Sequence, residues 1–246
     1  MAATSKQWGK DVLSPDELMD SLEEVRAGYG GLRRAGGRRA ETVEAIADQK
    51  RRTHRGGDGN HRFEGERYLN IPSSHKEVRR FQLRKLVDEG GQDSVDGPMP
   101  SHPTLSRWHS AEFGLTEEEI HRLEMEDASP ESLTYGGWYY LMHRTEPWPV
   151  LLGSALVGEG AKRLPEVKEA QLRALDDTRE LYQQLGIKDI DRAMLGQIEH
   201  SPIGADDAHV VFGENMTREH VNTPELQEAL RKVFIFRLHR ERRDSL

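Results

Sequence analysis

The sequence has no cysteine among its 246 residues. This absence excludes disulfide bonds, thiol nucleophiles, zinc fingers and iron–sulfur clusters held by cysteine. A metal bound by this chain must therefore use oxygen and nitrogen ligands. The sequence supplies many of them, with 11 histidines and 43 acidic residues.

Long apolar runs are also lacking. No run approaches the roughly 18 residues that a membrane span requires, and the first residues, MAATSKQWGKDVLSPDE, contain no apolar signal core. We therefore expect a cytoplasmic protein with no membrane partner. The length suits one helical domain over residues 1–246.

The chain has fewer basic than acidic residues, so its net charge is −8 at pH 7. This balance disfavours nucleic acid as a partner. Residues 33–55 are the exception, with eight Lys or Arg residues against three acids. This segment is either a patch for an anionic partner or a solvated helix face beside a Gly-rich loop.

Helix-start signals and helical spacing of apolar residues recur along the chain. Ser14 with Glu17, Thr116 with Glu119, and Thr223 before Pro224 are such signals. Strand alternation with hairpin turns is absent, so the fold class is predicted to be all-α. The expected helices cover 14–28, 40–53, 74–90, 102–113, 116–127, 131–144, 149–164, 166–186, 188–199, 203–221 and 224–243.

Two segments, 56–70 and 90–101, are predicted to be loops from their Gly, Asp and Pro content. We expect residues 1–73 to form N-terminal helices joined by polar loops rich in Arg and Gly. Residues 74–243 then form the core, which carries the candidate site.

Two patterns point to metal-binding chemistry. Glu159 stands alone in the apolar stretch PWPVLLGSALVGEG, where an isolated carboxylate is costly unless it is paired or bound to a metal. Asp206 and His209 form a D-x-x-H pair that falls on one helix face, and His200 precedes it. The alternatives are a Glu159–Arg163 pair and an acidic helix start followed by a packed His209.

Glu89 ends the helix KEVRRFQLRKLVDE, and His102 opens the next one, HPTLSRWHSAEFGL. Taken alone, Glu89 could be a surface residue and His102 a residue beside a helix cap. The ferritin-like pattern needs two E-x-x-H motifs. The chain has only Glu118 with His121, in a charged run expected to face solvent.

In order, these segments resemble the heme-oxygenase-like di-iron oxidases and oxygenases over residues 74–240. The resemblance rests on KEVRRFQLRKLVDEGG followed by SHPTLSRWHSAEFGL, on PWPVLLGSALVGEG, and on LYQQLGI followed by D-x-x-H and Thr-Pro-Glu. It implies a heme-oxygenase-like helical bundle. It also implies six metal ligands, in the order Glu89, His102, Glu159, His200, Asp206 and His209.

The family spaces its last His and Asp four residues apart, whereas His200 and Asp206 are six apart with Pro202 between them. His200 therefore needs a kink or a new helix start to reach the metal. The implied cofactor is two Fe(II) ions per chain, with O2 as co-substrate. Glu159 or Asp206 is expected to bridge the metals.

The resemblance implies a small, amino-acid-derived substrate, with N-oxygenation, desaturation or oxidative C–C cleavage in natural-product biosynthesis as outcomes. Arg144 is the candidate carboxylate clamp, and Tyr140 and Tyr68 are the candidate lining residues. The neighbouring aromatic residues also fit core packing.

A metal-free oxidase of the same fold and a non-catalytic helical binding protein using residues 33–55 are the alternatives. A thiaminase-like hydrolase would need the cysteine that this chain lacks. A homodimer is one assembly compatible with the sequence.

Overall fold

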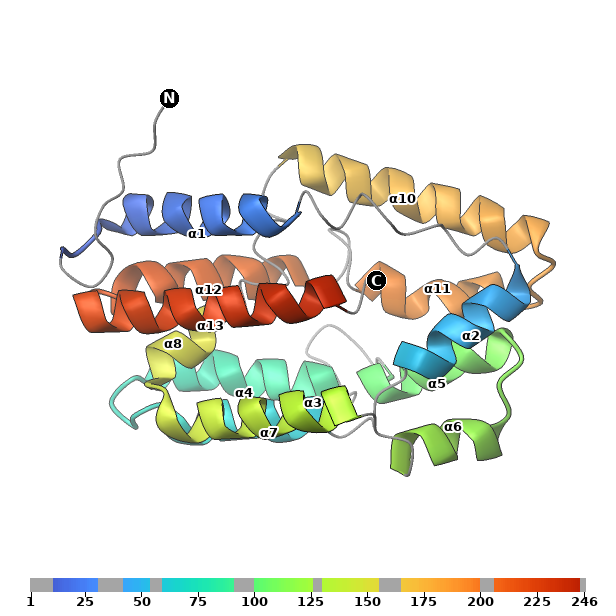
Figure 1. The fold of residues 1–246 in the computed structure, drawn as a ribbon, viewed down its shortest axis with the longest axis horizontal. Helices are drawn as coiled ribbons and strands as arrows, with labels where there is room; N and C mark the ends of the chain where they lie inside the picture. The colour runs from blue at the N-terminus through green and yellow to red at the C-terminus, as the bar shows by residue number, and fades with distance from the viewer. Residues whose placement is uncertain are drawn as a thin grey trace. The chain divides into compact units, whose positions relative to one another are not determined.

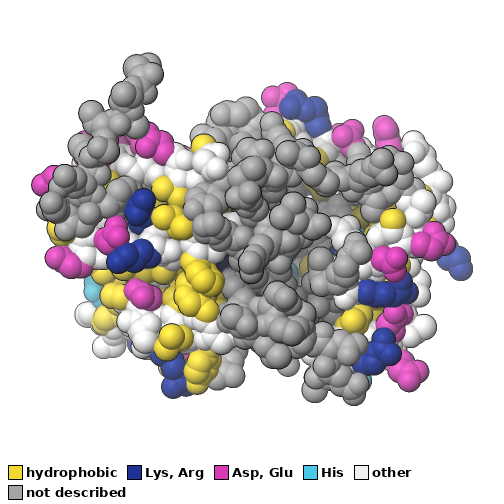
Figure 2. All heavy atoms as spheres, viewed as in Figure 1, with side chains coloured by type: hydrophobic (Ala, Val, Ile, Leu, Met, Phe, Trp, Pro, Cys, Tyr) yellow, Lys and Arg dark blue, Asp and Glu magenta, His cyan; other side chains and the backbone are white. Residues whose placement is uncertain are grey.

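The computed structural model describes residues 11–30, 42–53, 59–90, 100–125, 130–154, 165–199 and 206–243. Within these ranges the chain forms helices and no strand, which confirms the all-α prediction (Figure 1). None of the described helices is long and apolar enough to cross a membrane. On the face that Figure 2 shows, acidic and basic side chains of the described residues lie interspersed.

The chain divides into two compact units. Unit 1 comprises Met1–Arg38, Thr145–Leu164 and Ala208–Leu246, and unit 2 comprises Arg39–Arg144 and Pro165–Asp207. The expected division of the chain at residue 73 stays a prediction.

Unit 1 contains α1 (Pro15–Gly30), α8 (Trp148–Gly153), most of α12 (Asp206–His220) and α13 (Pro224–Arg243). Helix α13 packs against α1 and α8, and Leu18, Leu22, Leu230 and Phe234 are buried. Gln227 on α13 binds the segment that precedes α1. Its Oε1 accepts from the Leu13 N–H and its Nε2 donates to the Leu13 carbonyl oxygen, each at 2.9 Å.

Unit 2 contains the other helices: α2 (Val43–Thr53), α3 (Gly59–Asn70), α4 (Lys76–Gly90), α5 (His102–Glu112), α6 (Glu117–Met125), α7 (Pro130–Thr145), α10 (Pro165–Gln184) and α11 (Ile190–Glu199). Helix α5 packs along α11, and α3 packs along α4. The core near α5 contains Phe113, Tyr182 and Met194. The ring centroids of Phe113 and Tyr182 lie 5.0 Å apart.

The predicted helix starts are confirmed where the structure describes them. Ser14 and Glu17 form a reciprocal capping box, since each side chain accepts a hydrogen bond from the other residue's backbone N–H. Thr116 accepts from the Glu119 N–H, and Thr223 accepts from the Leu226 N–H at 3.3 Å. Glu118 and His121 are exposed on α6, as expected.

The predicted loop at 56–70 is wrong, because Gly59–Asn70 forms helix α3. Its inward face carries Glu64 and Arg67 instead of apolar residues, so the apolar spacing that indicates a helix is absent. Ion pairs and hydrogen bonds hold this helix in place. Asn70, for example, donates to the backbone oxygen of His143 at 2.9 Å.

The buried face of helix α4 differs from the one that its apolar residues Val78, Phe81 and Leu86 predict. Its buried residues are Val78, Gln82, Lys85 and Glu89, which are spaced at four, three and four residues and therefore lie on one face. Leu83 is 46% exposed. The helix thus turns a polar stripe toward the interior of unit 2.

Replacing Gly153 by alanine is expected to destabilise unit 1 by about 1–3 kcal/mol, because the new Cβ overpacks a filled site. It would lie 2.9 Å from Thr217 Oγ1 and 3.1 Å from the Leu230 methyl carbons. The Thr217 hydroxyl is itself fixed by a bond to Gly213 O. Chemical denaturation measures the change.

The matched control is Gly137→Ala in α7, where an added Cβ meets nothing within 4 Å. It should be neutral or stabilise the protein by up to about 1 kcal/mol through helix propensity. Equal effects of the two substitutions would contradict the close packing at Gly153.

His109 should make unit 2 acid-sensitive. Burial, and then the charge of Lys50, lower its pKa from 6.5 to about 4, and its Nδ1 donates to Ala193 O at 2.8 Å. As the pH falls below 6.5, the unfolded chain binds a proton that the folded chain takes up only near pH 4. The free energy of unfolding should therefore fall by about 2 kcal/mol between pH 7 and pH 5.

Urea denaturation at both pH values tests this. His109→Gln keeps a donor for Ala193 O and does not titrate, so its loss between pH 7 and pH 5 should be smaller than that of the wild type. His121→Gln, at an exposed residue of α6, should behave as the wild type does. A wild-type loss that persists in full in His109→Gln would assign the acid sensitivity to another group.

Candidate metal centre

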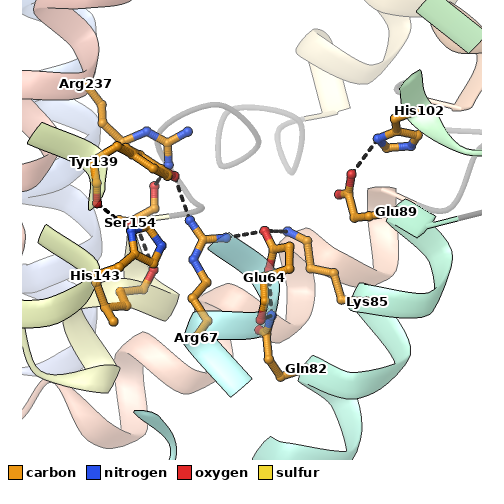
Figure 3. A network of polar contacts seen from close by, with 11 residues as sticks. Glu64, Arg67, Gln82, Lys85, Glu89, His102, Tyr139, His143, Ser154 and Arg237 are labelled. Carbon is orange, nitrogen blue, oxygen red and sulfur yellow. Dashed lines mark hydrogen bonds and ion pairs between the residues drawn. The ribbon is translucent and has the colours of Figure 1, made fainter. Parts of the chain in front are cut away.

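Glu89 and His102 face each other across the end of α4 and the start of α5. Glu89 Oε2 lies 2.6 Å from His102 Nδ1 (Figure 3). The Glu89 residue is 8% exposed, and the His102 side chain is 19% exposed. Both residues belong to unit 2. Two of the six residues implied as metal ligands therefore converge, although twelve sequence positions separate them.

The sequence around His102 explains its placement. Ser101 is the N-cap of α5 and its hydroxyl accepts from the Thr104 N–H at 3.2 Å. Pro103 follows in the first turn, where its missing N–H leaves no helical bond unmade. His102 is therefore the first residue of a well-defined helix. Glu89 lies in the last turn of α4.

A buried ion network lies beside this pair. It consists of Glu64 and Arg67 on α3, Gln82 and Lys85 on α4, and Tyr139 on α7 (Figure 3). Arg67 pairs with Glu64 through Nη1 and donates from Nη2 to Tyr139 Oη at 2.7 Å. Gln82 Nε2 donates to the Glu64 carboxylate, and Lys85 Nζ lies 3.9 Å from Glu64 Oε1. All five residues are at most 7% exposed.

The electrostatics of the network keep Glu64 ionised. Burial alone raises the pKa of Glu64, and the charge of Glu89 adds to that rise. The charges of Arg67 and Lys85, together with the Gln82 hydrogen bond, outweigh both effects, so the pKa lies below its usual value. The Glu64 and Glu89 carboxylates therefore repel each other. The positively charged side chains of Arg67 and Lys85 lie against Glu64.

The other implied ligands are described less fully. Asp206 is the first residue of α12, and His209 lies one turn later on that helix and is buried. The side chain of Asp206, and all of Glu159 and His200, lie outside the described residues. Within the described part of the chain, no three His, Asp or Glu side chains form a group that could hold a metal. The six-ligand set stays a prediction.

The single-residue alternatives can be judged at three positions. Glu89 is buried, so the alternative of a surface residue is wrong. His102 does follow a helix cap, and it contacts Glu89 as well. His209 is packed in unit 1, as one alternative expected.

The candidate substrate residues lie on α7 and α3. The Arg144 guanidinium stacks over the Tyr140 ring at 4.4 Å, and Arg79 stacks over Tyr68 at the same distance. Arg144 is exposed, and both tyrosines are half-buried. The Arg144–Tyr140 stack presents a cation on an aromatic face, an arrangement that suits a planar carboxylate.

The donor set at Glu89 and His102 fits a divalent metal. A carboxylate oxygen and an imidazole nitrogen are suitable ligands for Fe(II), Mn(II) and Zn(II). Their donor atoms lie 2.6 Å apart, and an ion bound by both would replace this direct contact. These two residues therefore supply two of the ligands of a candidate metal centre.

Glu64, Arg67, Gln82 and Lys85 were not predicted as site residues from the sequence. Two signals were present, the i,i+3 pair of Glu64 with Arg67 and the i,i+4 pair of Lys85 with Glu89. Such pairs are usually solvated, so spacing alone did not distinguish a buried network from a surface one.

Comparison with protein-family models, with curated proteins and with solved structures found no match to this chain.

Replacing Tyr139 by phenylalanine should destabilise the protein by about 1.5–3 kcal/mol, because the buried Arg67 guanidinium loses one of its acceptors. Tyr68→Phe is the control. The Tyr68 hydroxyl makes no hydrogen bond within the described residues, so its loss should change the free energy of unfolding by less than about 0.5 kcal/mol. Equal effects in thermal and urea denaturation would show that Arg67 does not depend on the Tyr139 hydroxyl.

Proposed function

We propose that this chain is a non-heme di-iron oxidase or oxygenase with a heme-oxygenase-like helical bundle, acting with O2 on a small, amino-acid-derived substrate. The observation that carries the proposal is the contact between the buried Glu89 and the half-buried His102, at 2.6 Å. A carboxylate oxygen and an imidazole nitrogen are ligands of the kind that Fe(II) takes in proteins, and here they lie at one place.

Three features support the proposal. Glu89 and His102 belong to an ordered set of six His, Asp and Glu residues in the sequence. The secondary-structure elements of the described residues are all helices. The chain has no thiols, so mixed carboxylate and imidazole ligation is the metal chemistry open to it.

The residues have distinct roles in this proposal. Glu89, Glu159 and Asp206 supply anionic oxygen ligands, and Glu159 or Asp206 is the bridging carboxylate. His102, His200 and His209 supply neutral nitrogen ligands. Two iron ions, when bound, supply the electrons that reduce O2.

Substrate binding is assigned to α7. Arg144 holds the carboxylate of an amino-acid-derived substrate through paired N–H donors, as guanidinium groups do. Its stack on Tyr140 limits the rotation of its side chain, so the carboxylate is held in one orientation. Tyr68, which stacks under Arg79 in the first turn of α4, is the weaker candidate for contact with the substrate.

Anaerobic reconstitution with Fe(II) tests the proposal. The wild type is expected to bind about two ions per chain. Glu89→Ala and His102→Ala should each lose at least one of them, because each removes a ligand. Iron analysis after desalting gives the count, and circular dichroism verifies the fold.

Glu118→Ala is the matched control, since Glu118 is exposed on α6, and it should bind iron as the wild type does. Faster O2 consumption by the loaded protein with a free amino acid would identify the substrate class. Iron binding that is absent in the wild type, or unchanged in both ligand variants, would rule the proposal out.

A further inference from the structure

The buried ion network is costly to the fold. Arg67, Glu64 and Lys85 are 4%, 6% and 6% exposed, and removing such charges from water is unfavourable until pairing offsets it. Apolar residues of the same volume often give equal or greater stability at such sites. Stability alone therefore does not account for these buried charges, and their position indicates a further role.

Their position points to Glu89. Lys85 and Glu89 lie one turn apart on the buried face of α4. In Figure 3 the Lys85 side chain extends toward Glu64, and Glu89 extends toward His102. The Glu64 carboxylate is close enough to Glu89 for the two to repel. The side chains of Glu64 and Lys85 thus bring charges of opposite sign near the candidate metal ligand.

We propose that Glu64 and Lys85 are positioning residues that set the affinity of the Glu89–His102 site for a divalent cation, with Glu64 raising it and Lys85 lowering it. The inference rests on the proposed function, since it takes this site to bind metal. Neither residue is a ligand. Each acts on the bound ion through its charge and through the orientation of the Glu89 carboxylate.

The effect is large because the charges are buried. A charge several ångströms from an ion in a protein interior is screened far less than in water. Residues just outside a metal's ligands typically change its affinity by about tenfold to a hundredfold when replaced.

Two substitutions remove one charge each and keep the shape of the side chain. Glu64→Gln removes the negative charge against which the Lys85 ammonium lies, so cation affinity should fall by about tenfold or more. Lys85→Met removes a positive charge beside the site and leaves Glu64 paired with Arg67, so affinity should rise by about tenfold. Both variants should melt at lower temperature, because each breaks an ion pair of the buried network.

The opposite signs distinguish this role from a structural one. A purely structural network would loosen the site in both variants and lower both affinities. Titration of the full-length chain with Co(II) at one pH, followed by its visible absorption, measures the affinities. Glu77→Gln and Lys76→Met, at exposed residues of the same helix, make the same charge changes and should shift affinity by less than about twofold.

The double variant Glu64→Gln with Lys85→Met keeps the test decisive if a single variant does not fold. It should bind Co(II) with an affinity between the values expected for the two single variants, close to that of the wild type. Weaker binding by the double variant would overturn the inference.

Changes of the same sign in the two single variants, or no change, would overturn this inference and leave the proposed function standing, provided that the wild type binds Co(II) through Glu89. Absence of Co(II) binding by the wild type would overturn both.

Discussion

The pairing of Glu64 with Arg67 and Lys85 is the interaction on which the interior of unit 2 depends. The three residues, with Gln82 and Tyr139, connect α3, α4 and α7 through charge and hydrogen bonds. A helix whose inward face is charged cannot gain its stability from apolar burial alone. The orientation of α3 and α4 follows, because any rotation would leave a buried charge without its partner.

This constraint determines which side of α4 points inward. With Gln82 and Lys85 held against Glu64, the residue one turn after Lys85 on the same face is Glu89. The Ser101 cap then starts α5 at His102. The contact between Glu89 and His102 is therefore the joint result of an ion network on one helix pair and a helix cap on the next. A change in either would move one of these two side chains away from the other.

Local sequence signals predicted most of the helices, because caps and apolar spacing act within a few residues. The Ser14, Thr116 and Thr223 starts are examples. Helix α3 could not be predicted in this way, since its inward face carries Glu64 and Arg67 and its stability comes from partners on α4 and α7. The buried face of α4 could not be predicted either, because most of its buried residues are polar or charged. The apolar residues of α4 suggested a different orientation.

At the site, the resemblance to the heme-oxygenase-like di-iron proteins implied Glu89 and His102 as ligands, and the structure describes the two residues in contact. The charges beside them were not predicted, because a spacing of three or four residues is equally common on solvated helix faces. Burial is a property of the assembled helices. It turns an ordinary Glu–Arg pair into one that acts strongly on its surroundings.

The position of Glu89 at the end of α4 determines how these charges act on it. The last turn of a helix carries partial negative charge from its unpaired carbonyl groups, and Glu89 lies in that turn. The helix end and the Glu89 carboxylate both place negative charge here, and the ionised Glu64 adds to it. Arg67 and Lys85 oppose that charge in the buried interior. On the proposal that Glu89 and His102 bind a cation, the Lys85 ammonium one turn from Glu89 stabilises these carboxylates in the absence of the cation and lowers the affinity for it.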